Sequence, residues 1–348
     1  MLTAAISVDT LAFVTKTDDN IVRIDSEGYA PFEQNLDDLS FVESEAGDSK
    51  ALVKGIAKYF VDNGFNVGGF TASVTSCVPA AAGVSSSASF ELLIAEIFNV
   101  LYNDGAVPKM KKAQASQYAE NVYFLKPCGL MDQSAISLGG VSMIDFENVE
   151  NPFVLGVQYP FTDTDIVITN TGGNHADLTS DYAAIRAEME EVSEKFSEKY
   201  LRLVDYQKFL DAIPALQNEV SGRAIMRAIH FFDENLRVDK AVSAINMKNA
   251  DAFYKIVGES GDSSFKLLQN CYVPADTVQR IPLGIVLSQH VTGVKAVRVH
   301  GGGFAGTIIA FVEKAETHEY VSRMSEVFGA EHVYKLSIRQ EGACRVEF

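Results

Sequence analysis

The stretch CVPAAAGVSSSASFELLIAE, residues 77–96, joins a loop of small residues to an amphipathic helix. Three alanines, one glycine and three consecutive serines leave the start of that helix free of bulky side chains. The first N–H groups of a helix have no intrahelical partner, and the helix dipole adds positive potential at the same place. The stretch therefore predicts an anion site, such as one for phosphate. A serine N-cap on a helix that only packs would explain the same residues, so the rest of the sequence is needed to choose.

Composition narrows the class of protein. The 348 residues are 47% hydrophobic and 22% charged, which suits a globular chain of about two domains. The formal net charge of −17 disfavours binding to nucleic acid or to an anionic membrane. The four cysteines show no metal-type spacing, no apolar run reaches about 18 residues, and the N-terminus lacks the basic start of a signal peptide. We therefore expect a cytoplasmic protein with reduced thiols and without membrane or nucleic-acid partners.

Hydrophobic periodicity predicts an α+β fold, because strands and helices fall in two blocks without regular βαβ alternation. Strands are expected at 2–16, 20–25, 68–76, 295–300, 307–312 and 332–338 and from 164 onward, and helices at 49–63, from the quoted stretch to about 102, and at 109–122 and 317–328. A further helix is expected to carry Ile185, Met189, Val192 and Phe196 on one face. The pattern changes at 152–163, which predicts an N-terminal domain of 1–155 and a C-terminal domain of 160–348.

Three short segments are candidates for phosphate chemistry: PAAAGVSSSAS at 79–89, CGLMDQ at 128–133 and VHGGGFAG at 299–306. Neither the P-loop pattern nor a dinucleotide-binding glycine fingerprint occurs in the chain. Each segment also has an ordinary explanation by itself. The glycines fit a strand-to-strand turn, Asp132 fits a helix cap, and Glu120 fits a surface glutamate.

Taken together and in this order, the three segments resemble the motifs of galactokinases, in the GHMP small-molecule kinase superfamily. That family typically shows PLGAGLSSSAS, CGIMDQ and GGGFGG, and the likeness extends to ENVYF before the second segment and ITNTGGNHADLTSDYAAIR after it. The resemblance implies a two-domain GHMP-kinase architecture with the active site between the domains. It implies phosphorylation of galactose at its C1 hydroxyl by ATP with Mg²⁺, in a monomer. An N-acetylgalactosamine kinase and a non-catalytic sensor of sugar or nucleotide remain alternatives.

The resemblance also assigns roles to residues. Asp132 corresponds to the catalytic aspartate, which accepts or orients the proton of the C1 hydroxyl, and Ser87, chosen over Ser86, shares Mg²⁺ with Glu120. Gly129, Asp132 and Tyr182 correspond to sugar-binding residues, although a half-buried tyrosine at a helix start would explain Tyr182 equally well. The implied ATP-binding residues are Gly83, Val84, Ser85, Ser86, Ser87, Ala88, Gly301, Gly302 and Gly303.

This chain departs from the family pattern in a few places. PAAAGV stands for PLGAGL, His300 stands where threonine is common, and Ala305 stands where glycine is usual. The family's N-terminal motif, GRVNLIGEHTDY, is not found, and the residues from Met1 to Ile6 resemble the strand that follows it. In the family that motif supplies an arginine near the transferring phosphate and contacts to the sugar hydroxyls.

We therefore expect the 348-residue chain to bind ATP but to phosphorylate galactose poorly. A cation on the transferring phosphoryl group contributes roughly 10³-fold or more in rate, and Arg298, the nearest candidate to replace it, is expected in a strand. A coupled ADP-release assay with galactose, run on this chain and on one extended upstream, measures the difference. Equal and substantial turnover from both chains would contradict the expectation.

Overall fold

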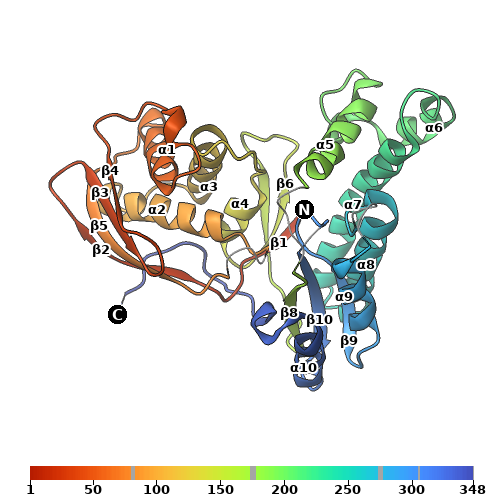
Figure 1. Ribbon diagram of the computed structural model, residues 1–348. Coiled ribbons are helices and arrows are strands. Elements are labelled where there is room, and N and C mark those ends of the chain that lie inside the picture. Colours follow the sequence, from red (N-terminus) through yellow and green to blue (C-terminus); the bar gives the residue numbers. More distant parts are fainter. Residues whose placement is uncertain (80–82, 173–177, 273–276, 305, 348) are drawn as a thin grey trace. The chain divides into compact units, whose positions relative to one another are not determined.

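The structure is a computed structural model that describes residues 1–79, 83–172, 178–272, 277–304 and 306–347 (Figure 1). The chain forms two compact units. The N-terminal unit consists of Thr3–Ser142 and Ile338–Phe348, and the C-terminal unit of Met1–Leu2 and Met143–Ser337. The boundary expected at 152–163, with domains of 1–155 and 160–348, lies later in the chain than this division and stays a prediction.

A four-stranded mixed sheet forms one layer of the N-terminal unit. Its strand order is β2-β5-β3-β4; β5 runs antiparallel to β2 and parallel to β3, and β4 is antiparallel to β3. Helices α1 and α2 lie against the sheet (Figure 1), and their apolar side chains share one core cluster with those of the strands. The elements are β2 (Thr10–Lys16), β3 (Ile21–Ser26), β4 (Phe32–Asn35), η1 (Glu43–Glu45), α1 (Ser49–Asp62), β5 (Phe70–Ser76), α2 (Ser86–Tyr102), α3 (Lys109–Tyr118), η2 (Ala119–Tyr123) and α4 (Met131–Leu138).

Local sequence explains the first helix of this unit. The Asp48 side chain accepts a hydrogen bond from Lys50 N at 2.9 Å and so caps α1 at its N-terminus. The helical spacing of Leu52, Ile56 and Phe60 places all three in the core, with exposed fractions of 4%, 0% and 0%. The prediction of a buried helical face at 49–63 is therefore confirmed.

The C-terminal unit is built on a four-stranded antiparallel sheet in the order β11-β8-β10-β9. Its elements are β7 (Phe153–Val157), β8 (Thr164–Asn170), α5 (Thr179–Glu194), η3 (Leu201–Leu203), α6 (Tyr206–Leu216), α7 (Gly222–Asn246), α8 (Ala250–Ser263), η4 (Ser264–Leu268), α9 (Arg280–Gln289), β9 (Val294–Val299), β10 (Thr307–Glu313), α10 (Thr317–Phe328), η5 (Ala330–His332) and β11 (Val333–Leu336). Within the described residues, no helix is long and apolar enough to cross a membrane.

The continuous strand expected at 2–16 was wrong, because this stretch has two different partners. Strand β1 (Leu2–Ala4) belongs to a sheet of order β1-β6-β7 with β6 (Val141–Asp145), whereas β2 pairs with β5. The division between the units runs through β1 and β6. A single straight strand cannot follow both sheets, so regular pairing stops between Ala4 and Thr10.

Two other predicted elements have different ends. The helix expected at 109–122 stops being α-helical at Tyr118 and continues as the π-helical turn η2, in which Phe124 N donates to Ala119 O at 2.9 Å. Helix α5 ends at Glu194, because Ser197 turns the chain with φ 59°; Phe196 nevertheless packs against the same apolar cluster as Val192.

The segment Ile338–Phe348 completes the N-terminal unit after the chain has passed through the other unit. Gly140 N donates to Arg339 O at 2.8 Å, Arg339 N to Ala5 O at 2.9 Å, and Ala343 N to Ile136 O at 3.1 Å. The returning segment is therefore tied to the last turn of α4 and to the backbone that leads into β2. The alternation of apolar residues carried no sign of this return.

Close packing of α1 against η2 depends on Gly55. A Cβ added at Gly55 would lie 2.8 Å from Ala119 Cα, which is backbone and cannot turn away. The π-helical turn that carries Glu120 therefore packs closely on α1 at a position where α1 has no side chain.

We expect Gly55→Ala to destabilise the protein by about 1 kcal/mol, because overpacking costs about 1–3 kcal/mol and better helix propensity returns about 1 kcal/mol. The matched control is Gly258→Ala on α8, where an added Cβ meets nothing within 4 Å. That control should gain about 0.5–1 kcal/mol. Thermal unfolding measures both, and a Gly55→Ala protein at least as stable as the wild type would contradict the packing argument.

Candidate active site

The start of α2 has the backbone geometry of a tight entry into a helix. Gly83 and Ser85 both lie in the left-handed region, with φ of 69° and 62°, and Ser85 is the N-cap residue. Ala88 is buried in the first turn and Val84 is half-buried. The predicted phosphate loop also includes residues 80–82, which lie outside the described residues.

The catalytic residue implied by the resemblance, Asp132, contacts this helix start. Asp132 stands in the first turn of α4, and its Oδ2 accepts a hydrogen bond from Ser85 Oγ. The Asp132 carboxylate is half-buried. One candidate proton acceptor therefore lies beside the N-terminus of α2.

Glu120, the other carboxylate singled out from the sequence, is buried in η2 with 3% of its surface exposed. Its Oε1 accepts a hydrogen bond from Ser87 Oγ at 3.3 Å and pairs with Lys126 Nζ at 3.0 Å. Ser87 and Glu120 therefore meet, and a surface position for Glu120 is excluded.

Two buried residues that sequence reasoning did not single out complete this cluster. Gln133 Nε2 donates to Glu120 Oε2 at 3.0 Å and to Glu91 Oε2 at 3.2 Å. Burial, followed by the charge on Glu120, raises the pKa of Glu91 to about 8. The sequence carried a usable signal for both: Glu91 follows Ser87 by one helical turn, and Gln133 follows Asp132 directly.

The turn that carries Gly129 is held by side chains of the preceding helical segment. Cys128 N donates to Asn121 Oδ1 at 2.6 Å, and Cys128 O accepts from Asn121 Nδ2 at 3.2 Å and from Gln117 Nε2 at 3.3 Å. A Cβ added at Gly129 would meet nothing within 4 Å. The Gly129 backbone therefore borders open space, and burial keeps the Cys128 thiol protonated by raising its pKa.

The glycine segment belongs to the C-terminal unit, where Tyr182 of α5 packs on it. Tyr182 Oη donates to Gly303 O at 2.7 Å, and its ring meets Phe304 edge-on at a centroid distance of 5.1 Å. A Cβ on Gly302 would lie 2.6 Å from Tyr182 Cε1. Gly303 has φ 83°, and a Cβ on it would clash with Asn270 O. Both positions therefore require glycine. Gly301 precedes them with φ 66°, and Ala305 lies outside the described residues.

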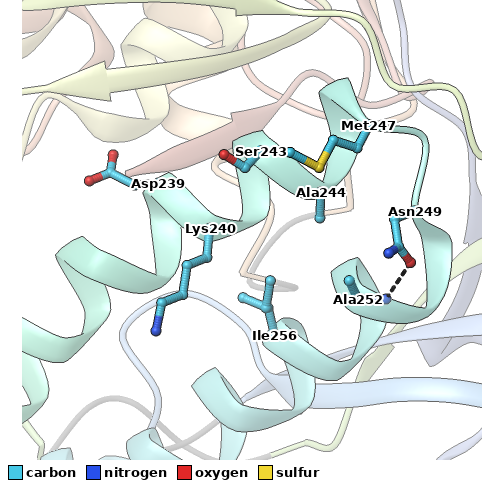
Figure 2. Close-up of a pocket in the computed structure, with 8 residues that line it drawn as sticks. All are labelled: Asp239, Lys240, Ser243, Ala244, Met247, Asn249, Ala252 and Ile256. Atoms are coloured by element: carbon cyan, nitrogen blue, oxygen red, sulfur yellow. Dashed lines mark hydrogen bonds between the residues drawn. The ribbon is translucent and has the colours of Figure 1, made fainter.

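A pocket of about 330 Å³ lies between α7 and α8 (Figure 2), and none of the predicted site residues lines it. Most of its lining residues are exposed, and Asn249 caps α8 by accepting from Ala252 N at 3.0 Å. Within the described part of the chain, no three His, Cys, Asp or Glu side chains gather to hold a metal ion.

Comparisons with known proteins place this chain among small-molecule kinases. Residues 51–140 match the family model of the GHMP kinases N terminal domain. The galactokinase of Clostridium tetani (strain Massachusetts / E88) is 29% identical over 346 residues, which cover 95% of this chain and 83% of the relative. The galactokinase of Homo sapiens is 30% identical over 297 residues, covering 84% of this chain and 71% of the relative.

Solved structures agree with this placement. The Lactococcus lactis galactokinase complexed with galactose matches with a TM-score of 0.81 and 25% identity, over 97% of this chain and 87% of that one. A mevalonate kinase matches with a TM-score of 0.65 and 14% identity, over 98% of this chain and 92% of that one, which shows the shared fold. Fold and site thus define a sugar kinase of the GHMP type. Within that class, the chain belongs to the galactokinase family.

We expect Tyr182→Phe to loosen the glycine segment without removing the packing of the ring on Phe304. Loss of one hydrogen bond costs about 1 kcal/mol, so amide hydrogen exchange in the peptide that contains Phe304 should become about fivefold faster. Tyr334→Phe, which removes a hydroxyl bonded to Glu331 O elsewhere in the same unit, is the control. Unchanged exchange near Phe304 in the Tyr182 variant would show that this hydroxyl does not hold the segment.

Proposed function

We propose that this protein transfers the γ-phosphoryl group of ATP to the C1 hydroxyl of galactose, producing galactose 1-phosphate. Membership of the galactokinase family supports the substrates. The observation that carries the proposal is the pair of contacts at one helix start, Ser85 with Asp132 and Ser87 with Glu120. A candidate proton acceptor and a candidate metal ligand thereby lie beside the same helix N-terminus.

The helix start suits a phosphate chain. The first N–H groups of α2 have no intrahelical partner and point out of the helix toward an incoming anion. The small residues Gly83 and Ser85–Ser87 leave those groups accessible, and the Ser86 hydroxyl adds a donor. We assign Gly83 to Ala88 to the ATP phosphates, and Gly301 to Gly303 to the nucleotide.

The residues at Glu120 fit Mg²⁺. Hard cations prefer oxygen ligands, and Mg²⁺ takes few of them from protein, at about 2.0–2.1 Å, which puts neighbouring ligands about 3 Å apart. Ser87 Oγ and Glu120 Oε1 are 3.3 Å apart, so both can serve one cation. When bound, Mg²⁺ neutralises charge on the phosphate oxygens.

Asp132 acts on the sugar. Its carboxylate would accept or orient the proton of the C1 hydroxyl, so that the oxygen lone pair is aimed at the γ-phosphorus. Ser85 Oγ, already bonded to Asp132 Oδ2, fixes the orientation of that carboxylate. We assign Gly129 and Tyr182 to the remaining sugar contacts. The open space at Gly129 supports the first assignment, and the second rests on the resemblance.

We also propose a cytoplasmic, monomeric enzyme. The four free cysteines suit a reducing compartment, and the net charge of −17 is unfavourable for nucleic acid. Sedimentation or light scattering tests the monomer directly.

We expect Asp132→Asn to lower kcat by about 10²–10⁴-fold while the affinity for ATP stays nearly unchanged, because the amide cannot accept the proton. The variant is made in whichever of the two chain lengths compared above gives turnover, and ADP release and ATP binding are measured separately. Normal turnover in the variant would rule out the carboxylate as base. A wild-type protein that binds both ligands without turnover would instead be a sensor.

A further inference from the structure

Gln133 is a buried amide that joins three elements of the N-terminal unit. It lies on α4, is 1% exposed, and donates through Nε2 to Glu120 on η2 and to Glu91 on α2. A primary amide has two N–H hydrogens. The two carboxyl groups are the nearest acceptors of these hydrogens, and Cys128 Sγ lies 3.6 Å from the same nitrogen.

The two carboxylate oxygens of Glu120 have different partners. Oε2 is held by Gln133, whereas Oε1 faces Ser87 Oγ and Lys126 Nζ. The Lys126 side chain is 61% exposed, so its ammonium can move away into solvent. With Oε2 fixed, rotation of the carboxylate is restricted and Oε1 stays directed toward Ser87.

Glu120 determines which way the Gln133 amide faces, and Glu91 holds the amide from its other side. Glu91 is fully buried, with 0% of its surface exposed, and its Oε2 accepts from the Gln133 NH₂ group at 3.2 Å. Turning the amide over would place the Gln133 oxygen against the Glu120 carboxylate, oxygen against oxygen. Within the described residues, Glu91 Oε1 and Gln133 Oε1 have no hydrogen-bond partner.

We propose that Gln133, held between Glu91 and Glu120, is a positioning residue that keeps the Glu120 carboxylate ready for the divalent cation. The inference rests on the proposed function, because it takes Glu120 as a ligand of that cation. A buried group that orients a metal ligand typically changes metal affinity by about 10–100-fold when removed. A purely structural Gln133 would change stability but leave the cation affinity of the folded protein intact.

The test is a titration with Mn²⁺ as the probe, in the presence of ADP. Electron paramagnetic resonance measures the free Mn²⁺, and a protein-free titration corrects for Mn²⁺ bound by ADP alone. We expect Gln133→Met, which keeps the volume and removes the donor, to raise the Mn²⁺ dissociation constant by about 10-fold or more. Circular dichroism confirms that each variant is folded at the temperature used.

The matched control is Gln34→Met on β4. Gln34 is also buried, at 8% exposure, and its Nε2 donates to Asn35 O at 2.7 Å, so the same substitution removes a buried amide outside the cluster. Its Mn²⁺ affinity should equal that of the wild type. If Gln133→Met does not fold, Gln133→Asn keeps the amide but is too short to reach both carboxyl groups, and it should show the same loss.

Glu120→Gln separates the inference from the proposed function. Weak Mn²⁺ binding in Glu120→Gln together with normal binding in the Gln133 variant overturns the inference and leaves the metal assignment in place. Normal binding in Glu120→Gln overturns the metal assignment itself. Weak binding in both variants, with Gln34→Met unchanged, supports the positioning role.

Discussion

The candidate site depends on the contacts that the Glu120 carboxylate makes. This carboxylate is buried at the π-helical turn η2 and meets Ser87 from α2, Gln133 from α4 and the ammonium of Lys126. A buried carboxylate without such partners would be costly. Helices α2 and α4 and the turn η2 therefore cannot shift independently, and their contacts fix the position of the start of α2. Gly55 contributes from outside, because it lets α1 support η2 at backbone distance.

Sequence periodicity predicted most of the elements because their faces are strongly one-sided. The spacing of Leu52, Ile56 and Phe60 located α1, and α10 has the predicted bounds of 317–328. The expected strand at 2–16 was wrong because alternation of apolar residues says nothing about which strand is the partner. The change of partner between Ala4 and Thr10 depends on backbone groups of Gly140 and Arg339, far away in the chain.

The candidate site divides in a similar way. Ser87, Glu120 and Asp132 were reached through their motifs, and the structure brings Ser87 to Glu120 and Ser85 to Asp132. Glu91 and Gln133 were missed although their spacing from Ser87 and Asp132 was a usable signal, because only the tertiary fold shows a buried amide between two carboxyl groups. Tyr182 was singled out from the sequence, but its contact was not. Its hydroxyl is bonded to the glycine segment, which neither residue type nor spacing could indicate.

The return of Ile338–Phe348 to the N-terminal unit sets the order of events during synthesis. On the ribosome, α4 with Asp132 emerges long before Arg339 and Ala343, whose backbones bond to Gly140 and Ile136. All of the C-terminal unit except Met1–Leu2 is translated in the interval. Until then, the last turn of the helix that carries the candidate base lacks these hydrogen bonds. They join residues far apart in the sequence, and contacts of this kind form slowly. Synthesis of the returning segment, rather than collapse of the first half of the chain, completes this unit.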